Sequence, residues 1–252
     1  MDYGKKTTEF FKLIMAQMQL TIDFREGDDR KELANVIWNR LFDIDGPRIV
    51  HKRPSAKAIF IANKLFRPLS EIMSSIETIS NIEIYIRNPS YKRQGISRLN
   101  YLKYHIDNYL NELYLLKNRL IAYLTTLERA YKKSDNSAQV KSTLGPLHII
   151  VSRALDGYIE MRGYHVHQNR YADDDLDRLT ALALLSRSSD EFGIFMHSMF
   201  TAAYRDIKRK WAKNVKTGLK GLQKLLEHYF GNLLEVFSSK GKFLYPSNVR
   251  WT

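Results

Sequence analysis

The chain has no cysteine among its 252 residues, which excludes disulfides, thiolate zinc sites and cysteine nucleophiles. It also lacks a long uncharged apolar run, because Lys, Arg, Asp or Glu interrupts every hydrophobic stretch before the roughly 18 residues that a membrane span needs. The first residues do not form a signal-peptide pattern. A glycine-rich phosphate loop is missing as well. We therefore expect a cytoplasmic protein without a membrane span and without a cofactor.

Lysine and arginine outnumber the acidic residues 40 to 27, which gives the chain a net charge of +13. This excess favours polyanionic partners such as RNA, DNA or an acidic membrane surface. A charged surface that serves only solubility is the alternative. Hydrophobic residues make up 44% of the chain, which is enough for one main core in a protein of this length.

The strongest pattern in the sequence is a hydrophobic seam between about Ser97 and Lys132. Apolar residues recur there strictly every three or four positions, at Leu99, Leu102, Ile106, Tyr109, Leu113, Leu116, Leu120, Tyr123 and Leu127. A seam with this spacing packs along neighbouring helices, as in a helical bundle. A strand would need alternation, which is absent. The pattern predicts one long amphipathic core helix.

Shorter helices are expected on both sides of this segment. One should run from Pro54 to about Ile79 with a kink at Pro68, followed by a break at residues 88–90. Residues 133–145, rich in Ser, Asn and Lys, predict a loop. The later helices have expected bounds of Pro146 to Gly163, Asp173 to Leu185, and Ser189 to about Phe237 with a break at 214–221.

The predicted fold class is all-α, a helical bundle with helical additions at both ends. Asp28 and Asp29 can cap an N-terminal helix, so residues 1–53 are expected to form an N-terminal helical appendage. Residues 54–240 should form the bundle together with the basic C-terminal helices. Residues 241–252 are expected to be a tail.

One short motif could carry chemistry, an Arg followed by His after four residues, in the sequence Arg162-Gly-Tyr-His-Val-His167. The bare spacing is common in a chain with this much Arg and His. In one continuous helix, positions 162 and 167 would lie about 140° apart, and only His165 would share the Arg face. Because Gly163 is expected to end the helix, either histidine could converge on Arg162 in a loop.

This motif and the long helix, which reads Tyr101-Leu-Lys-Tyr-His-Ile-Asp-Asn-Tyr-Leu-Asn-Glu-Leu-Tyr114, resemble the HEPN superfamily, and more narrowly an uncharacterised bacterial HEPN-like branch. The resemblance covers roughly residues 54–185. It implies a helical bundle, often dimeric, and in many members a metal-independent ribonuclease of toxin–antitoxin or antiphage systems. It also implies Arg162 and His167 as the catalytic pair. The chain departs from the family at Gly163, where a polar residue is usual, and at Asn169, where some toxins have a modifiable Tyr.

The implied chemistry is coherent for RNA. A neutral His167 can accept the proton of a ribose 2′-hydroxyl, while the planar Arg162 guanidinium holds the phosphate as negative charge builds. This cleavage leaves a 2′,3′-cyclic phosphate and needs no metal, and a homodimer could supply both base and acid. Alternatively, Arg162 caps a helix C-terminus and the histidines are ordinary loop residues.

Two further groups are weaker candidates. His105, Asn108 and Glu112 share one face of the long helix, beside the seam. This face could line a cleft that also holds the motif of Arg162 to His167. A solvated face is the simpler interpretation. His165 and His167 could join the aspartates at 173–175 around a divalent metal. Helix capping by the aspartates is simpler, so no metal site is expected.

The last candidate is a basic ladder near the C-terminus, formed by Arg205, Arg209, Lys213, Lys216, Lys220 and Lys224 at spacings of three or four residues. It suits phosphate contacts along a nucleic acid, with an anionic membrane surface or a solvated face as alternatives. The sequence thus predicts an RNA-binding, HEPN-like endoribonuclease with an antitoxin or defence partner. The alternative is a non-catalytic helical adaptor for nucleic acid or protein.

Overall fold

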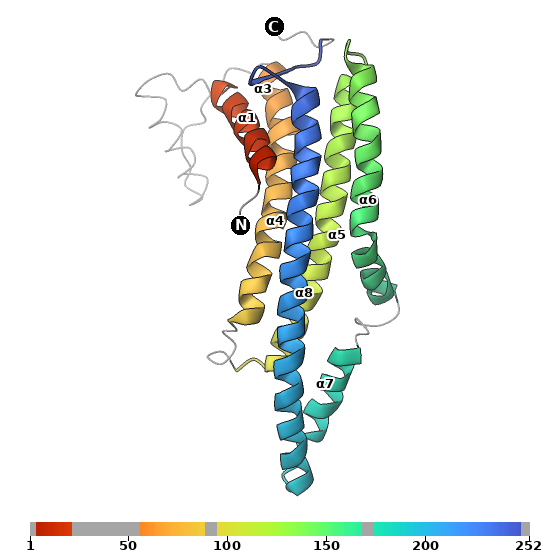
Figure 1. Ribbon diagram of the computed structural model, residues 1–252. Helices are drawn as coiled ribbons and strands as arrows, with labels where there is room; N and C mark the ends of the chain where they lie inside the picture. The colour runs from red at the N-terminus through yellow and green to blue at the C-terminus, as the bar shows by residue number, and fades with distance from the viewer. Residues whose placement is uncertain (1–3, 22–55, 89–94, 168–173, 248–252) are drawn as a thin grey trace, which may run out of the picture.

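The computed structural model describes residues 4–21, 56–88, 95–167 and 174–247, and these are almost entirely helical, as the all-α prediction requires. The long helices α4, α5, α6 and α8 run side by side along one axis, and α1 crosses the upper part of the bundle (Figure 1). None of the described helices combines the length and hydrophobicity that membrane crossing requires. The elements are α1 (Lys5–Thr21), α3 (Ala56–Phe60), η1 (Ile61–Phe66), α4 (Arg67–Arg87), α5 (Arg98–Tyr131), α6 (Ser137–His167), α7 (Asp174–Leu185), α8 (Glu191–Phe237), β1 (Ser238–Ser239) and β2 (Lys242–Phe243).

Helix α5 is the predicted long helix, and it lies at the centre of the bundle. Ser97 caps its first turn by accepting a hydrogen bond from the backbone N–H of Asn100. All nine seam residues are buried, and α5 packs against α4, α6, α7 and α8. The buried hydroxyl of Tyr229 on α8 donates to the Leu120 carbonyl of α5 at 2.9 Å, which fixes the two helices along their axes.

Helix α6 corrects two predicted boundaries. It begins at Ser137, inside the expected loop, and it passes through Gly163 to His167. Pro146 is interior to the helix, but it is exposed, as is Ser142, whose carbonyl loses its helical donor and can bind water instead. A continuous buried stripe outweighs these breakers, because Val140, Leu144, Leu147, Val151 and Leu155 all face the core.

Helix α8 is one uninterrupted helix of 47 residues, so the break predicted at 214–221 is wrong. Trp211, Val215, Leu222 and Leu226 are buried across the predicted break, and their burial offsets the roughly 1 kcal/mol that each interior glycine costs. The N-cap is Asp190 rather than Ser189, with its side chain accepting from the Gly193 N–H at 2.8 Å.

The start of α8 carries an apolar face that is largely exposed. Phe192, Phe195 and Met199 keep about half of their surface in contact with solvent, and Phe200 is the first residue of this face to be buried. This end of α8 extends past the other long helices, and among the described helices only α7 lies beside it (Figure 1).

The irregularity predicted at Pro68 is a wide π-helical turn just before it. In η1 the Arg67 N–H donates to the Ala62 carbonyl, five residues back, and α4 then starts with Pro68 in its first turn, where a missing N–H is tolerated. Helix α4 ends at Arg87, so the break predicted at 88–90 begins where it was expected.

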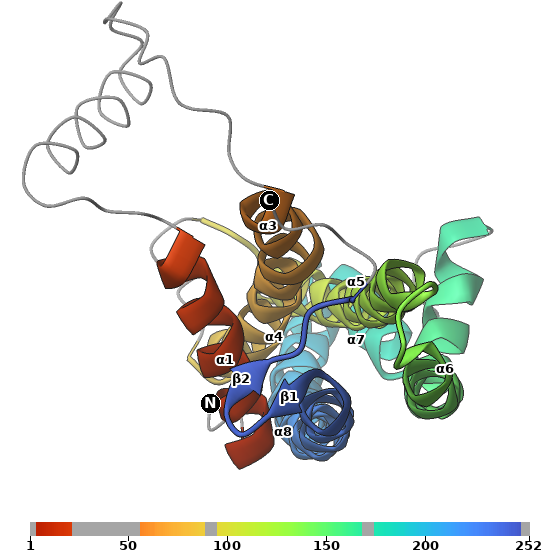
Figure 2. The same cartoon turned by 90° about the horizontal axis from the view of Figure 1, so that it is seen from above.

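Helix α1 and the β1–β2 hairpin lie next to each other at one end of the bundle (Figure 2). Helix α1 lies within the stretch expected as an appendage, and its Phe10, Leu13 and Ile14 belong to the common core. The β1–β2 hairpin then turns the chain back, with Ser238 paired to Phe243. The Tyr245 hydroxyl donates to the Gln17 amide oxygen of α1 at 2.8 Å, which joins the described part of the tail to α1.

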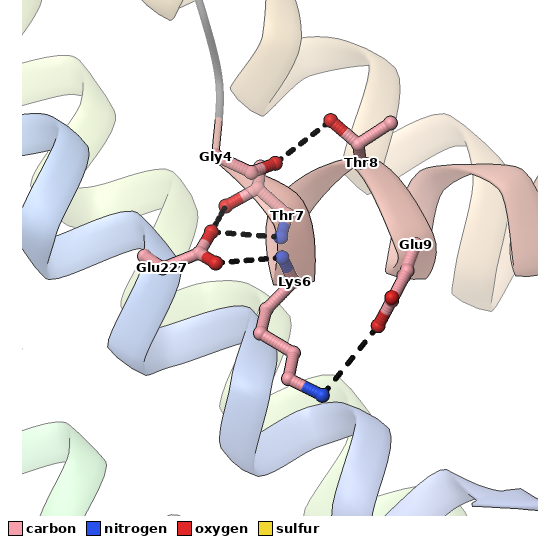
Figure 3. A network of polar contacts seen from close by, with 6 residues as sticks. All are labelled: Gly4, Lys6, Thr7, Thr8, Glu9 and Glu227. Atoms are coloured by element: carbon pink, nitrogen blue, oxygen red, sulfur yellow. Dashed lines mark hydrogen bonds and ion pairs between the residues drawn. The ribbon is translucent and has the colours of Figure 1, made fainter.

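Helix α1 has no acidic residue in its first turn, and α8 provides one instead. Glu227 accepts hydrogen bonds from the Lys6 N–H at 2.7 Å, and from the Thr7 N–H and hydroxyl at 3.2 Å each (Figure 3). Gly4 permits this approach, because it has a positive φ of 83° and a Cβ there would overlap the carboxylate. Burial by itself would raise the Glu227 pKa, but the donors of α1 outweigh it and lower the pKa.

We predict that Glu227→Gln destabilises the protein by about 1 kcal/mol at pH 7, because the amide cannot accept all of the donors of α1. The pKa of Glu227 is lower in the folded protein than its usual 4.5. The stabilisation is therefore present above pH 4.5 and is lost as the pH falls through the folded-state pKa. Urea unfolding at a series of pH values measures both effects.

Glu235→Gln is the matched control, since Glu235 is an exposed residue of the same helix. A Glu227→Gln variant as stable as this control at pH 7, or a difference that persists unchanged at low pH, would contradict the capping role.

Candidate nucleic-acid interface

The basic ladder lies on one exposed face of α8. All six of its residues are exposed, while Ile207, Trp211, Val215, Leu222 and Leu226 on the other side of the helix are buried. At 100° per residue the six positions fall within an arc of about 100°, and at 1.5 Å per residue they extend over about 28 Å. We call Arg205, Arg209, Lys213, Lys216, Lys220 and Lys224 the basic face.

Few negative charges lie near the basic face. Eight basic residues and one acidic residue, Asp206, occur between positions 205 and 224. Lys210, outside the basic face, pairs with Asp175 of α7 at 2.5 Å. Within the described residues, no ion pair neutralises any residue of the basic face, so its charge is directed to solvent.

A largely apolar groove of about 660 Å³ adjoins the basic face between α5, α6 and α8. Tyr109, Leu113, Leu155 and Leu222 are among its apolar residues, and Lys213 of the basic face also lines it. An apolar surface beside a row of cations suits an unpaired base, because bases of single strands stack or pack on such surfaces while their phosphates contact Lys and Arg.

The motif of Arg162, His165 and His167 lies in the last turns of α6, not in a loop. Gly163 does not end the helix, which continues to His167. Positions 162 and 167 therefore lie about 140° apart around the helix axis, and position 165 about 60° from 162. The side chains of these residues, and the residues 168–173 that follow, lie outside the described part of the structure.

The stripe of His105, Asn108 and Glu112 faces α4. Glu112 accepts a hydrogen bond from Ser75 of α4 at 3.3 Å, and the His105 ring lies 5.1 Å from that of Tyr85, also on α4. Asn108 between them is half-buried. Contact with α6 comes from the other side of α5, where Lys117 pairs with Asp156 at 2.6 Å. The contacts of the stripe within the described residues are therefore with α4, and a cleft shared with the end of α6 stays a prediction.

Glu112 is part of a polar cluster between α4 and α5 that the sequence did not suggest. Arg119 donates to the buried Ser75 hydroxyl and pairs with Glu71 at 2.9 Å, while the same hydroxyl donates to Glu112. In the sequence, Glu71 and Ser75 are four residues apart and so lie on one helix face, and this spacing could have indicated the polar cluster. Glu112 thus takes part in a polar contact that joins α4 to α5.

His105 is buried among the rings of Tyr85, Tyr101 and Tyr104. Burial lowers its pKa below 6.5, because the charged imidazolium loses hydration. Its Nδ1 has no hydrogen-bond partner within the described residues. The described part of the structure contains no group of three His, Asp or Glu side chains able to hold a metal ion. Burial thus favours the neutral form of the His105 ring, which packs against Tyr85 of α4.

Comparison with family models, with curated proteins and with solved structures found no match to this chain. Function must therefore be inferred from the residues described above. Among them, the basic face of α8 and the groove beside it combine a row of exposed cations with an adjoining apolar surface. Two further cations near it, Arg87 and Lys208, were not among the sequence candidates.

We predict that the His105 ring titrates below pH 6.5 in the folded protein and at about 6.5 in urea. Since the folded-state pKa is depressed, His105 favours folding at neutral pH and this contribution is lost as the pH falls from about 6.5 through the folded-state value. NMR of the imidazole signals, assigned with His105→Phe, measures both midpoints. Equal midpoints would contradict burial of the ring.

Proposed function

We propose that this protein binds RNA, with the strand lying along the basic face of α8. The observation that carries the proposal is the row of six exposed, unneutralised cations over about 28 Å of one rigid helix. Such a row matches the regular phosphates of a nucleic-acid backbone. The apolar groove beside Lys213 favours a single strand over a duplex, because only a single strand has bases free to enter it.

An anionic membrane surface fits this helix less well. A helix that binds in the membrane interface inserts an apolar face flanked by its cations. In α8 the apolar face opposite the cations is buried against the core, with Val215 and Leu226 fully inaccessible to solvent. Along residues 205–224, α8 therefore has no free apolar face to insert, and its exposed charges suit phosphates that stay in water.

The second part of the proposal is metal-independent cleavage of the bound RNA by Arg162 and His167. It is supported by the HEPN-like spacing of the two residues and by their place at the end of the helix that packs on α5. The 140° between their positions favours a homodimer, in which the Arg of one copy and the His of the other act on one phosphate. An antitoxin or defence partner follows from the same resemblance.

We predict that the affinity for a single-stranded RNA falls with salt along a log–log slope of about −4, since six phosphate contacts at about 0.7 each release that many counterions. The variant Lys213→Gln/Lys216→Gln/Lys220→Gln should reduce the slope by about 2 and lower the affinity at low salt. Fluorescence anisotropy with a labelled oligonucleotide at several salt concentrations measures both.

The matched control removes three exposed lysines of the α5–α6 connection and the first turns of α6, as Lys132→Gln/Lys133→Gln/Lys141→Gln. It changes the net charge equally and should keep the slope of the unmodified protein. If both triple variants lose affinity to the same extent, the protein binds RNA only through its overall charge and the proposed interface is wrong.

For cleavage, we predict that the purified protein cuts RNA in the presence of EDTA and leaves 2′,3′-cyclic phosphate ends, whereas Arg162→Ala and His167→Ala do not. Gel electrophoresis and mass spectrometry of the products read this out, and light scattering gives the mass of the active species. Intact RNA, or equal cutting by the variants, would refute the catalytic role and leave RNA binding as the function.

A further inference from the structure

A cavity of about 320 Å³ opens between the C-terminal end of α4 and residues 205–212 of α8. Its lining consists of four basic residues and one alanine: Arg87, Arg205, Lys208, Arg209 and Ala212. No acidic side chain is among them. The volume is at the small end of the range for ligand pockets, enough for about one nucleotide-sized group.

Two carboxylates lie close to the residues of this cavity, and they neutralise only part of the charge. Glu83 pairs with Nε of Arg87 at 2.7 Å, from one turn earlier on α4, and Asp206 is the sequence neighbour of Arg205. Four cations against two anions leave an excess of about two positive charges around a single concavity. Like charges gathered in this way repel one another unless an anion binds between them.

Lys208 is fixed in the cavity by the backbone of α4. Its ammonium group donates to the Arg87 carbonyl at 3.0 Å, and burial lowers the pKa of Lys208. Within the described residues, no carboxylate pairs with Lys208. A cation at a helix C-terminus is favourable by itself, and this contact accounts for Lys208. It does not account for Arg205 and Arg209, which join the same cavity from the exposed face of α8.

The cavity lies at one end of the basic face. Arg205 and Arg209 are its first two residues, and α8 has no Lys or Arg between its start at Glu191 and position 204. A strand that follows the basic face towards the start of α8 therefore meets the last cations of α8 here. The geometry suits the end of a strand rather than its middle.

We propose that this cavity is a pocket for a terminal phosphomonoester of the bound RNA, with Arg87 and Lys208 as its specific residues. A phosphomonoester carries nearly two negative charges at pH 7 and three oxygens that can accept hydrogen bonds, whereas an internal phosphodiester carries one charge. The excess of about two positive charges matches the dianion, and the Arg guanidinium groups can bind its oxygens in pairs. This inference rests on the proposed function, because it assumes a strand on the basic face.

The test compares oligonucleotides of one sequence that end in 5′-phosphate, in 3′-phosphate, or in hydroxyls at both ends. We expect one phosphorylated form to bind at least about tenfold more tightly than the hydroxyl form at pH 7.5. The advantage should shrink below about pH 6, where the phosphate takes up its second proton. Adenosine monophosphate and inorganic phosphate, as competitors, show whether the phosphate alone is recognised.

Arg87→Gln/Lys208→Gln should abolish the preference and leave the affinity for the hydroxyl form nearly unchanged, because neither residue belongs to the basic face. Lys132→Gln/Lys133→Gln is the control of equal charge and should keep the preference. Arg87→Lys retains the charge but not the paired hydrogen bonds, so it should weaken the preference in a chain that folds normally by circular dichroism.

The outcomes separate the two proposals. Equal binding of phosphorylated and hydroxyl forms, or a preference that survives in the double variant, overturns the pocket and leaves RNA binding in place. If no oligonucleotide binds but adenosine monophosphate binds to the unmodified protein and not to the double variant, the pocket stands as a mononucleotide site and the RNA proposal fails. If neither ligand binds, both proposals are wrong.

Discussion

Burial of the α5 seam is the constraint on which the rest of this fold depends. Helix α5 contacts every other long helix, so α4, α6 and α8 must each present a continuous apolar stripe to it or to one another. The need for continuous apolar stripes explains why Pro146 and Gly221 do not end their helices. Pro146 and Gly221 lie on exposed sides of stripes that pass them without interruption, and a helix that stopped at either would expose the next buried turn. Tertiary burial here exceeds the few kcal/mol of local preference.

The same constraint determines the shape of the basic face. A break at 214–221 would have divided the six cations into two short groups with separate directions. Because Val215 and Leu222 are buried against the core, the helix stays regular and the cations stay in one row. Packing of α8 against the core thus fixes the backbone positions from which these flexible Lys and Arg side chains extend. It also places the first turn of this row beside the end of α4, which is how Arg87 reaches Arg205 and Arg209.

Sequence periodicity predicts features that depend on a single helix, such as which face is apolar. It does not predict contacts between two helices. The seam of α5 and the one-sided ladder of α8 follow from spacing alone, and both were predicted. The facing of Glu112 towards Ser75, and the approach of Lys208 to the Arg87 carbonyl, depend on which helices are neighbours. Helix α1 was missed, since the acid that caps it, Glu227, comes from a helix more than 200 residues later. The helix end predicted at Gly163 is wrong, because that prediction depended on a single residue.

Continuity of α6 bears differently on the two parts of the proposed function. The basic face is complete in one chain, because all its cations belong to one helix. Positions 162 and 167 are separated by about 140° around the axis of α6. Under the proposal, cleavage by this pair would therefore use a second copy, whereas retention of RNA would need only one. Assembly of two copies would then be the step that adds cleavage to binding.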